Sequence, residues 1–193
     1  MAKTKSKNES NTRKLTWVGK RGYIANRYPG SNKVKLPVAE RLYYDEDGKS
    51  LVIPSLNIMS FLAATKTNSC VRLLTSGRGM ARLSHFINSF VSIEPYLIPM
   101  TRNGKQIVFK GMGNNGIHEF HASPVLDGGK RPDEPPVRVM IDLPWELEFD
   151  VTIHPNNQGI DWILIGNFFE EGGYAVGLGS FRSVFGKGLV TIS

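Results

Sequence analysis

The chain has 193 residues, which suits a single compact domain because domains commonly contain about 100–150 residues. Hydrophobic residues make up 40% of the chain, enough to build a core, and this disfavours general disorder. The single cysteine, Cys70, excludes an internal disulfide and cysteine-rich zinc modules. No apolar run approaches the ~20 residues that span a bilayer, and the first residues lack an apolar secretory core. We therefore expect a cytoplasmic protein without a membrane partner.

Positive charge is distributed unevenly along the chain. Overall, 24 Lys and Arg residues outnumber 17 Asp and Glu residues, which gives a net charge of +7. Residues 1–35 contain ten basic side chains and one acidic one, Glu9, and residues 66–110 contain seven basic side chains against Glu94 alone. A polyanionic partner would explain this asymmetry, because basic side chains that neutralise phosphates release counterions. The alternative is that a lysine-rich tail only aids solubility.

The first part of the chain predicts a tail, a strand, a hairpin and a helix. We interpret residues 1–13 as a basic flexible tail and residues 15–28 as a strand with a cationic outer side. Residues 42–53 have apolar ends around an Asp- and Gly-containing turn, which indicates a small hairpin. Ser55 can then cap the free amides at the start of a helix.

The middle of the chain is less regular. Between residues 80 and 90, apolar residues recur at spacings of three and four, which predicts a second helix, and residues 106–110 are interpreted as a strand. Residues 66–110 as a whole are interpreted as a basic insertion. Residues 111–136 are rich in Gly, Pro, Asn and Asp, which indicates a long excursion that could order on a partner.

The final third has the clearest pattern. Residues 137–153 alternate between apolar and other side chains, which is typical of strands half-buried in an antiparallel sheet. We expect Asn156–Asn157 to cap a helix that Gly172–Gly173 end. Short apolar strands at 174–176 and 189–192 would then enclose a glycine-rich loop.

These elements together predict an α+β fold. The simplest arrangement is a ferredoxin-like or RRM-like antiparallel sheet with helices on one face. Residues 14–193 would form this single domain, to which the basic insertion and the Gly/Pro-rich excursion are added.

The segment Gly177–Gly188 is the stretch best suited to bind a ligand. Its four glycines permit positive φ angles and a close backbone approach, and exposed amides can surround an anion. Arg182 can hold a phosphate through two donors, and Lys187 adds a second positive charge. A Walker loop is excluded, because it needs Gly-Lys-Ser/Thr at the start of a helix. The alternative is a hairpin whose glycines serve turn geometry alone.

Two segments resemble the RAMP superfamily, the ferredoxin-like RNA-binding proteins of CRISPR systems. The pattern Gly-x-Gly-x-x-Arg-Ser followed by Gly-x-Gly at residues 177–188 is similar to the C-terminal signature of that family. Upstream, residues 45–56 resemble the turn, strand and Ile-Pro entry into the first helix of the family. The likeness is greatest to the backbone subunit of class 1 effector complexes, especially the type III form.

The chain also departs from the family pattern. Asn57 and Ile58 stand where the family has Lys-Gly, and the glycine-rich loop has one extra residue before its final Gly-x-Gly. Type III backbone subunits cleave target RNA with an Asp that precedes the first hairpin, whereas residues 37–41 offer only Glu40. We therefore do not expect this protein to cleave a target itself.

The resemblance implies an RNA-binding subunit that coats single-stranded guide RNA as repeated copies in a ribonucleoprotein. Its partners would be the guide RNA, the target nucleic acid, further copies of itself and other effector subunits, with no cofactor and no metal. The implied RNA-binding residues belong to the glycine-rich loop, the first helix entry and the basic segments. They are Ser55, Gly177, Gly179, Arg182, Ser183, Gly186, Lys187, Gly188, Lys20, Arg21, Arg78 and Arg82.

Aromatic residues lie among the basic ones in the first quarter of the chain. Such side chains can stack on unpaired bases, although each of them can equally belong to the core. They are Trp17, Tyr23, Tyr28, Tyr43 and Tyr44.

Two other functions remain open. In a guide-processing endoribonuclease, His118 or His121 would act as general acid or base beside Arg102 or Lys105. These histidines do not predict a metal site, because further ligands are distant in the sequence. The other alternative is a phage-encoded mimic that inserts into a host effector and blocks its assembly. A non-catalytic protein is favoured over an enzyme.

Overall fold

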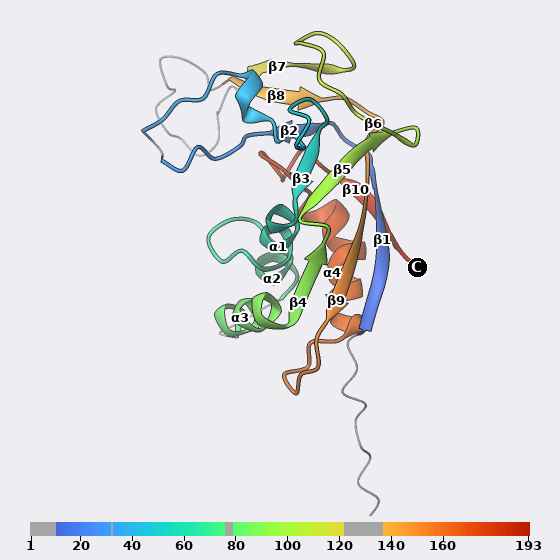
Figure 1. The fold of residues 1–193 in the computed structure, drawn as a ribbon. Helices are drawn as coiled ribbons and strands as arrows, with labels where there is room; N and C mark the ends of the chain where they lie inside the picture. The colour runs from blue at the N-terminus through green and yellow to red at the C-terminus, as the bar shows by residue number, and fades with distance from the viewer. Residues whose placement is uncertain (1–10, 32, 76–78, 122–136) are drawn as a thin grey trace, which may run out of the picture.

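Figure 1 shows a computed structural model of the chain, which describes residues 11–31, 33–75, 79–121 and 137–193. Within these ranges, no helix is long and apolar enough to cross a bilayer. The elements in chain order are β1 (Asn11–Gly19), β2 (Tyr23–Ala25), the 3-10 helix η1 (Ala39–Arg41), β3 (Val52–Pro54), α1 (Ser55–Ala63), α2 (Cys70–Leu74), α3 (Met80–Phe90), β4 (Val91–Glu94), β5 (Leu97–Arg102), β6 (Lys105–Gln106), β7 (Ile117–His121), β8 (Val137–Ile141), β9 (Glu146–Ile153), α4 (Trp162–Ala175) and β10 (Gly188–Ile192).

The main sheet is antiparallel and has the strand order β10-β1-β9, with β4 and β5 on the far side of β9. β4 pairs with the end of β9, where Ile93 lies opposite Val151, and β5 pairs with its beginning, where Met100 lies opposite Leu147. Helices α1–α3 lie between β1 and β4 in the chain, and α4 lies between β9 and β10. This is the βαββαβ order of a ferredoxin-like fold. The predicted α+β class is confirmed.

The helices cover one face of the main sheet (Figure 1). Residues of β1 and β9 point to this face at every second position, as the period of a strand requires. Trp17 packs edge-on against Phe61 of α1 with ring centroids 4.9 Å apart, and Phe149 packs against Phe169 of α4 at 5.9 Å. Burial of each such side chain stabilises the fold by about 1.5–3 kcal/mol. These contacts hold α1 and α4 on the same side of the sheet.

The opposite face of the main sheet is polar and acidic. In β9, Glu146, Glu148 and Asp150 alternate with the buried residues, and Asp150 lies opposite Lys14 of β1. This face would repel a phosphate backbone. The single strand expected at residues 15–28 is wrong, because β1 ends at Gly19 and β2 begins at Tyr23, so the basic residues 20–21 lie between two strands. On the outer face of β1 the basic residue is Lys14, which lies beside the acidic residues of β9.

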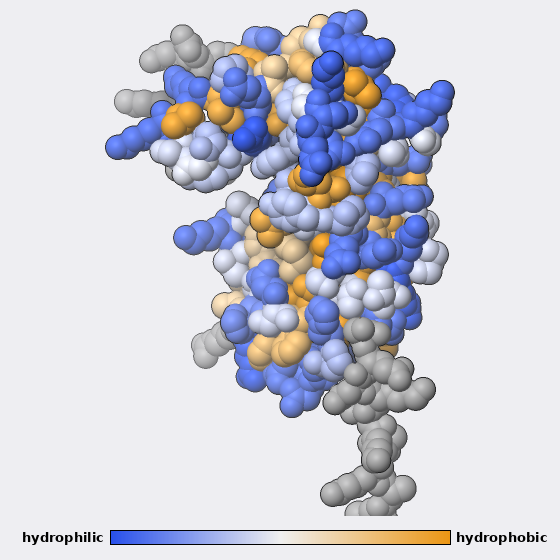
Figure 2. Space-filling model, in the orientation of Figure 1, coloured by the Kyte–Doolittle hydropathy of each residue, from blue (hydrophilic) through white to orange (hydrophobic). Residues whose placement is uncertain are grey.

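A smaller sheet with the order β2-β8-β7 lies at one end of the main sheet, beside η1 (Figure 1). Trp145 closes the junction between the sheets, because its Nε1 donates to Arg21 O at 2.8 Å and its ring packs edge-on against Tyr23. We call this sheet with residues 26–41 the small lobe, and the main sheet with its helices the main lobe. The small lobe overhangs α1 and α2, and Figure 2 shows a hollow between the two lobes.

The structure corrects the predicted domain organisation. Residues 66–110 are not an insertion, because they supply α2, α3 and β4–β6, and β4 and β5 pair with β9 in the main sheet. Residues 11–13 were expected in the flexible tail, but they begin β1 and pair with β9. Within the excursion 111–136, residues 117–121 form β7 and pair with β8. Residues 1–10 of the tail and 122–136 of the excursion lie outside the described residues, whereas residues 111–116 form turns before β7.

The predicted hairpin and the first two predicted helices are present. Tyr44 pairs with Leu51 across the turn, and α1 and α3 lie where the sequence predicts helices. The strand expected at 106–110 is shorter than predicted, because β6 covers only Lys105–Gln106. Ser55 does not cap α1, since it is the first residue of the helix and its own amide donates to Tyr96 O at 2.8 Å.

The boundaries of α4 differ from those expected. Asp161 caps this helix, because its Oδ1 accepts the Leu164 amide at 2.9 Å, and Asn156–Asn157 precede it. Gly172–Gly173 lie inside α4, so the predicted helix end there is wrong, as is the predicted strand at 174–176. Packing explains these glycines: α4 approaches its neighbours so closely that side chains at both positions would collide with them.

Two glycines of α4 should respond to alanine with opposite signs. A Cβ at Gly172 would lie 2.4 Å from Cys70 Sγ and 2.8 Å from Phe61 Cζ, whereas a Cβ at Gly166 would lie 3.5 Å from Ile192 Cδ1. Alanine gains up to about 1 kcal/mol over glycine in a helix, while overpacking costs about 1–3 kcal/mol. Gly166→Ala should therefore stabilise the protein slightly and Gly172→Ala should destabilise it by about 1–2 kcal/mol. Urea unfolding of both variants checks this, and equal shifts would contradict it.

Candidate nucleic-acid interface

The glycine-rich segment 177–187 connects the end of α4 to β10. It is a helix-to-strand loop and not the hairpin between two strands that the sequence predicts. Its backbone lies on β2 and on the connection that precedes it, because Ser180 N donates to Ile24 O of β2 and Gly186 N donates to Gly22 O, both at 2.8 Å. This loop therefore joins the main lobe to the small lobe.

The glycines of this loop are required by conformation and by close approach. Gly177, Gly179 and Gly186 have φ angles of 78°, 77° and 66°, in agreement with the predicted positive φ. A Cβ at Gly186 would lie 2.0 Å from Leu178 O, and a Cβ at Gly179 would lie 2.5 Å from Ile24 O. Side chains at these positions would push apart the backbone segments that contact one another in the loop.

Arg182 is held by the protein itself. Its Nε donates to Gly179 O at 3.1 Å, its Nη1 donates to Ser60 O at 3.3 Å and to Asn68 O at 3.1 Å, and its Nη2 donates to Ser60 Oγ at 3.0 Å. Burial lowers the pKa of the guanidinium from its usual value. An arginine pKa is high enough for the charge to persist at neutral pH. Arg182 thus ties the loop to α1 and keeps a positive charge at the loop surface.

The backbone amides beside Arg182 differ from its side chain in their hydrogen bonding. The amides of Phe181, Arg182 and Ser183 donate to no backbone carbonyl of the described residues. Phe181 has a φ of 53°, a left-handed conformation that is uncommon for a residue with a side chain. Successive amides in such a conformation form a concave surface that favours anions.

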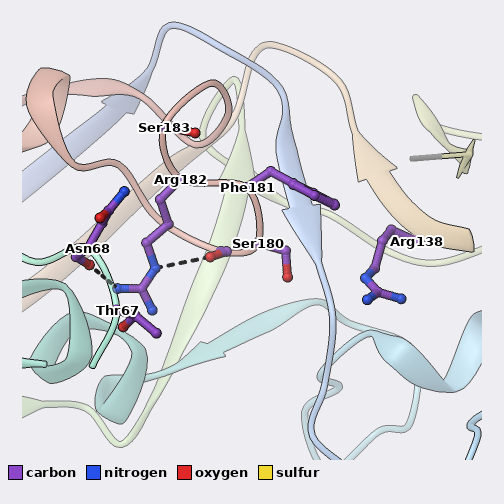
Figure 3. A pocket seen from close by; sticks show the side chains of 8 residues that line it. Thr67, Asn68, Arg138, Ser180, Phe181, Arg182 and Ser183 are labelled. Carbon is purple, nitrogen blue, oxygen red and sulfur yellow. Dashed lines mark hydrogen bonds between the residues drawn. The ribbon is translucent and has the colours of Figure 1, made fainter. Parts of the chain in front are cut away.

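A hollow of about 490 Å³ lies in front of these amides, between the loop, β8 and the α1–α2 connection. Figure 3 shows Arg182 and Arg138 on opposite sides of it, with Ser180 and Phe181 between them. We call it the first hollow. Its lining residues are Thr67, Asn68, Arg138, Gly179, Ser180, Phe181, Arg182 and Ser183.

Two further hollows continue the first one. The second hollow, of about 150 Å³, shares Gly179, Ser180 and Arg182 with the first, and it is also lined by Tyr23, Asn26, Tyr43 and Asn57. The third hollow, of about 260 Å³, shares Asn26 with the second and Arg138 with the first. Its other lining residues are Arg27, Tyr28, Pro29, Ser31, Val34, Lys35, Leu36 and Arg41. We call the three together the interlobe groove.

The interlobe groove is cationic. Five basic residues line it and no described residue in its lining is acidic; the five are Arg27, Lys35, Arg41, Arg138 and Arg182. In the described ranges, the contacts within 4 Å between basic and carboxylate groups involve histidines, not Arg or Lys. The groove therefore concentrates positive charge that a bound anion would neutralise.

The aromatic residues divide between core and groove. Trp17 and Tyr23 are buried, and Tyr44 is half-buried with its hydroxyl bonded to Ala39 O at 2.9 Å. Tyr43 is half-buried at the second hollow, and Tyr28 is 60% exposed at the third. Of the five aromatic residues proposed from the sequence, Tyr28 and Tyr43 therefore have a surface available for stacking beside the groove cations.

The other described basic residues that the sequence proposed, Lys187, Lys20, Arg21 and Arg82, lie outside the groove lining. Lys187 Nζ donates to Ala175 O at the end of α4, and burial lowers the pKa of its amino group. Lys20 and Arg21 are exposed, and both of their amides donate to Lys187 O. Arg82 lies on α3 with its guanidinium 5.1 Å from the Phe86 ring. Arg78 lies outside the described residues.

The remaining residues of the predicted set are structural neighbours of the groove. Ser55 is buried at the start of α1 and lines none of the three hollows, but Asn57, two residues later, lines the second hollow. Gly188 begins β10, where a Cβ would lie 2.1 Å from Trp17 Nε1. Ser183 lines the first hollow, as the loop pattern suggested.

The candidate catalytic residues are not assembled into one site. His118 Nδ1 lies 3.4 Å from Asp142 Oδ2 on an exposed part of the small lobe, and His121 Nε2 lies 3.7 Å from Glu119 Oε2. Arg102 does not present a free guanidinium to His118, because it donates to Pro144 O, Asn115 O and Asp142 O. Glu40 is exposed on η1. The described residues contain no group of three or more potential metal-binding side chains.

Most of the cations that line the groove were not predicted as binding residues from the sequence. Arg27, Lys35, Arg41 and Arg138 come from the β2–η1 segment and from β8, which no motif connects. One signal was available: Arg138 lies between the alternating apolar residues Val137 and Val139, and an arginine at such a position needs a polar environment. The pairing of β8 with β2 gives it that environment beside η1.

Fold and site together define a class: a small α+β protein of ferredoxin-like strand order, with a cationic groove beside a glycine-rich loop. No protein-family model matches the chain, and a search of curated proteins finds no match.

Proposed function

We propose that this protein binds single-stranded RNA in the interlobe groove. The observation that carries the proposal is the concentration of five basic residues, without an acidic one among the described lining residues, next to unpaired loop amides. Backbone phosphates account for most of the affinity of RNA-binding proteins, and cationic side chains and free amides are the groups that bind them. The acidic outer face of β9 argues against binding on the sheet.

Tyrosines support the choice of a single strand. Tyr28 and Tyr43 lie beside the cations and have partly exposed rings. Stacking on aromatic rings needs bases that are free of a duplex, and it is insensitive to base identity. We therefore expect binding with little sequence preference and a strong dependence on salt.

We further propose that the protein acts as a RAMP-like backbone subunit. It would coat CRISPR guide RNA as repeated copies in a class 1 effector ribonucleoprotein, without cleaving the target itself. Support comes from the proximity of the two RAMP-like segments. Asn57, which directly follows the segment 45–56, lines the second hollow together with Arg182 of the segment 177–188. The position of the glycine-rich loop between α4 and β10 agrees with this proposal.

Replacing groove cations should weaken RNA binding. The triple variant Arg27→Gln, Lys35→Gln, Arg138→Gln should bind a single-stranded RNA at least about tenfold more weakly than the wild type, because each lost charge removes a phosphate contact. The slope of log affinity against log salt should fall by about 2, at roughly 0.7 per phosphate on a single strand. Fluorescence anisotropy of a labelled oligonucleotide at several salt concentrations measures both quantities.

A matched control separates site binding from general electrostatic attraction. Lys14, Lys49 and Lys105 are exposed and line none of the three hollows, so the triple Lys→Gln variant at these positions removes the same charge. It should retain most of the affinity. Equal losses in the two triple variants, or the absence of RNA binding by the wild type, would overturn the proposal. A duplex of the same sequence should bind more weakly than the single strand.

A further inference from the structure

Two arginines of the third hollow converge on one acceptor. Nη1 of Arg41, from η1, and Nη1 of Arg138, from β8, both donate to the carbonyl oxygen of Val137, the latter at 3.2 Å. Arg41 Nε additionally donates to Leu36 O at 3.1 Å. Two positive charges therefore lie side by side with a single backbone oxygen between them.

This arrangement is unfavourable without a counter-charge. Arg138 Nε is buried and has no hydrogen-bond partner among the described residues. Burial, and then the neighbouring charge of Arg41, lower the pKa of Arg138. A buried donor without an acceptor costs about 1–3 kcal/mol, and like charges at short range repel. Among the described residues, the site therefore lacks an acceptor that carries negative charge.

The rest of the third hollow is suited to a nucleotide. Arg27 and Lys35 add positive charge at its rim, and both are exposed. Tyr28, in the same lining, is 60% exposed, which leaves its ring free to stack on a base. The hollow of about 260 Å³ is smaller than the first, and it borders the second hollow at Asn26 and the first at Arg138.

We propose that the third hollow binds a phosphomonoester dianion, namely the terminal phosphate of the RNA strand. The inference rests on the proposed RNA binding and adds which part of the strand this site recognises. A phosphomonoester carries a charge of about −1.5 to −2 at neutral pH, whereas a backbone phosphodiester carries −1. Two adjacent guanidiniums match the dianion in charge, and guanidiniums can bind phosphate oxygens in pairs.

The position of Arg138 indicates which way the bound RNA runs from its terminal phosphate. Arg138 lines both the third and the first hollow, so a terminal phosphate at Arg41 and Arg138 is adjacent to the space in front of Arg182. The terminal base would stack on Tyr28. The phosphodiesters that follow would then meet the free amides of Phe181–Ser183.

The test compares one oligonucleotide with different ends on the full chain. A ten-nucleotide single-stranded RNA with a 5′-phosphate, with a 3′-phosphate or with hydroxyls at both ends is measured by anisotropy competition. One of the two phosphorylated forms should bind about tenfold more tightly than the hydroxyl form, a difference typical of a charge-assisted contact. Equal affinities for all three forms would overturn this inference and leave the proposed function intact. Failure of every form to bind would overturn both.

Variants test whether the end preference arises at this site. Arg138→Gln and, independently, the exposed Arg27→Gln should reduce the preference for the phosphorylated end, whereas Lys14→Gln should leave it unchanged. Arg138→Lys should restore only part of it, because lysine keeps the charge and lacks the planar pair of donors. If the preference for the phosphorylated RNA persisted in both arginine variants, the terminal phosphate would bind elsewhere, and the inference would be overturned. Uridine 5′-monophosphate that competes as strongly as the phosphorylated RNA would also overturn it, since a free nucleotide would then be the ligand.

Discussion

Gly186→Ala is expected to destabilise the protein by roughly 3 kcal/mol or more. Two effects add: the left-handed φ of 66° is unfavourable for alanine, and the new Cβ would lie 2.0 Å from Leu178 O. Relief would require the backbone to move, and that movement would strain the bonds from Gly186 N to Gly22 O and from Leu178 N to Gly186 O. The melting temperature should fall by roughly 6–12 °C.

Gly159→Ala is the matched control for this prediction. Gly159 has a similar φ of 76°, but a Cβ there would meet nothing within 4 Å. It should cost only about 1 kcal/mol, the conformational part of the effect. Differential scanning fluorimetry of the two variants isolates the contribution of close packing in the loop. A melting temperature of Gly186→Ala equal to that of Gly159→Ala would contradict the described path of the loop.

Arg182→Lys should lose nearly as much stability and RNA affinity as Arg182→Ala. The guanidinium reaches Gly179 O, Ser60 O, Ser60 Oγ and Asn68 O at once, and a lysine amino group cannot match this geometry. We expect a loss of about 2–3 kcal/mol in the free energy of unfolding, because several hydrogen bonds of a partly buried cation are removed. RNA affinity should fall about tenfold in both variants, because the loop amides lose their fixed arrangement.

The comparison of lysine with alanine decides what Arg182 contributes. If the residue acted only as a positive charge, Arg182→Lys would keep wild-type affinity while Arg182→Ala would not. Lys187→Gln serves as the control within the same loop, since among the described residues the Lys187 side chain makes a single hydrogen bond, to Ala175 O. It should cost less than about 1 kcal/mol. Urea unfolding and anisotropy on the three variants give both readouts.

The structure explains the uneven distribution of charge along the chain. Acidic residues of β9 lie on the outer face of the main sheet, whereas the groove cations lie between the two lobes. The sequence indicated an excess of charge in residues 1–35, but only part of that segment contributes to the groove. Arg27 and Lys35 line it, whereas Lys20 and Arg21 lie beyond it.

Periodic patterns predicted secondary structure well where one face of an element is buried. The alternation in residues 145–153 predicted β9, because a strand with one buried face places an apolar side chain at every second residue. The spacing in residues 80–90 predicted α3 for the corresponding reason in a helix. Helix boundaries were predicted poorly where packing opposed the local signal. A Gly-Gly pair usually marks a helix end, but here Cys70 and Phe61 leave no space for a side chain at Gly172, and Gly188 O leaves none at Gly173.

The amino-acid sequence alone determined the α+β class, the hairpin at 42–53 and the positive φ angles of the glycine-rich loop. These properties depend on the conformational preferences and burial pattern of neighbouring residues, so they can be inferred from short stretches. Only the tertiary structure decided that Arg182 binds to α1 and that Arg41 meets Arg138. The acceptor that a long cationic side chain reaches depends on backbone from distant segments, and the pairing of β8 with β2 brings that backbone together.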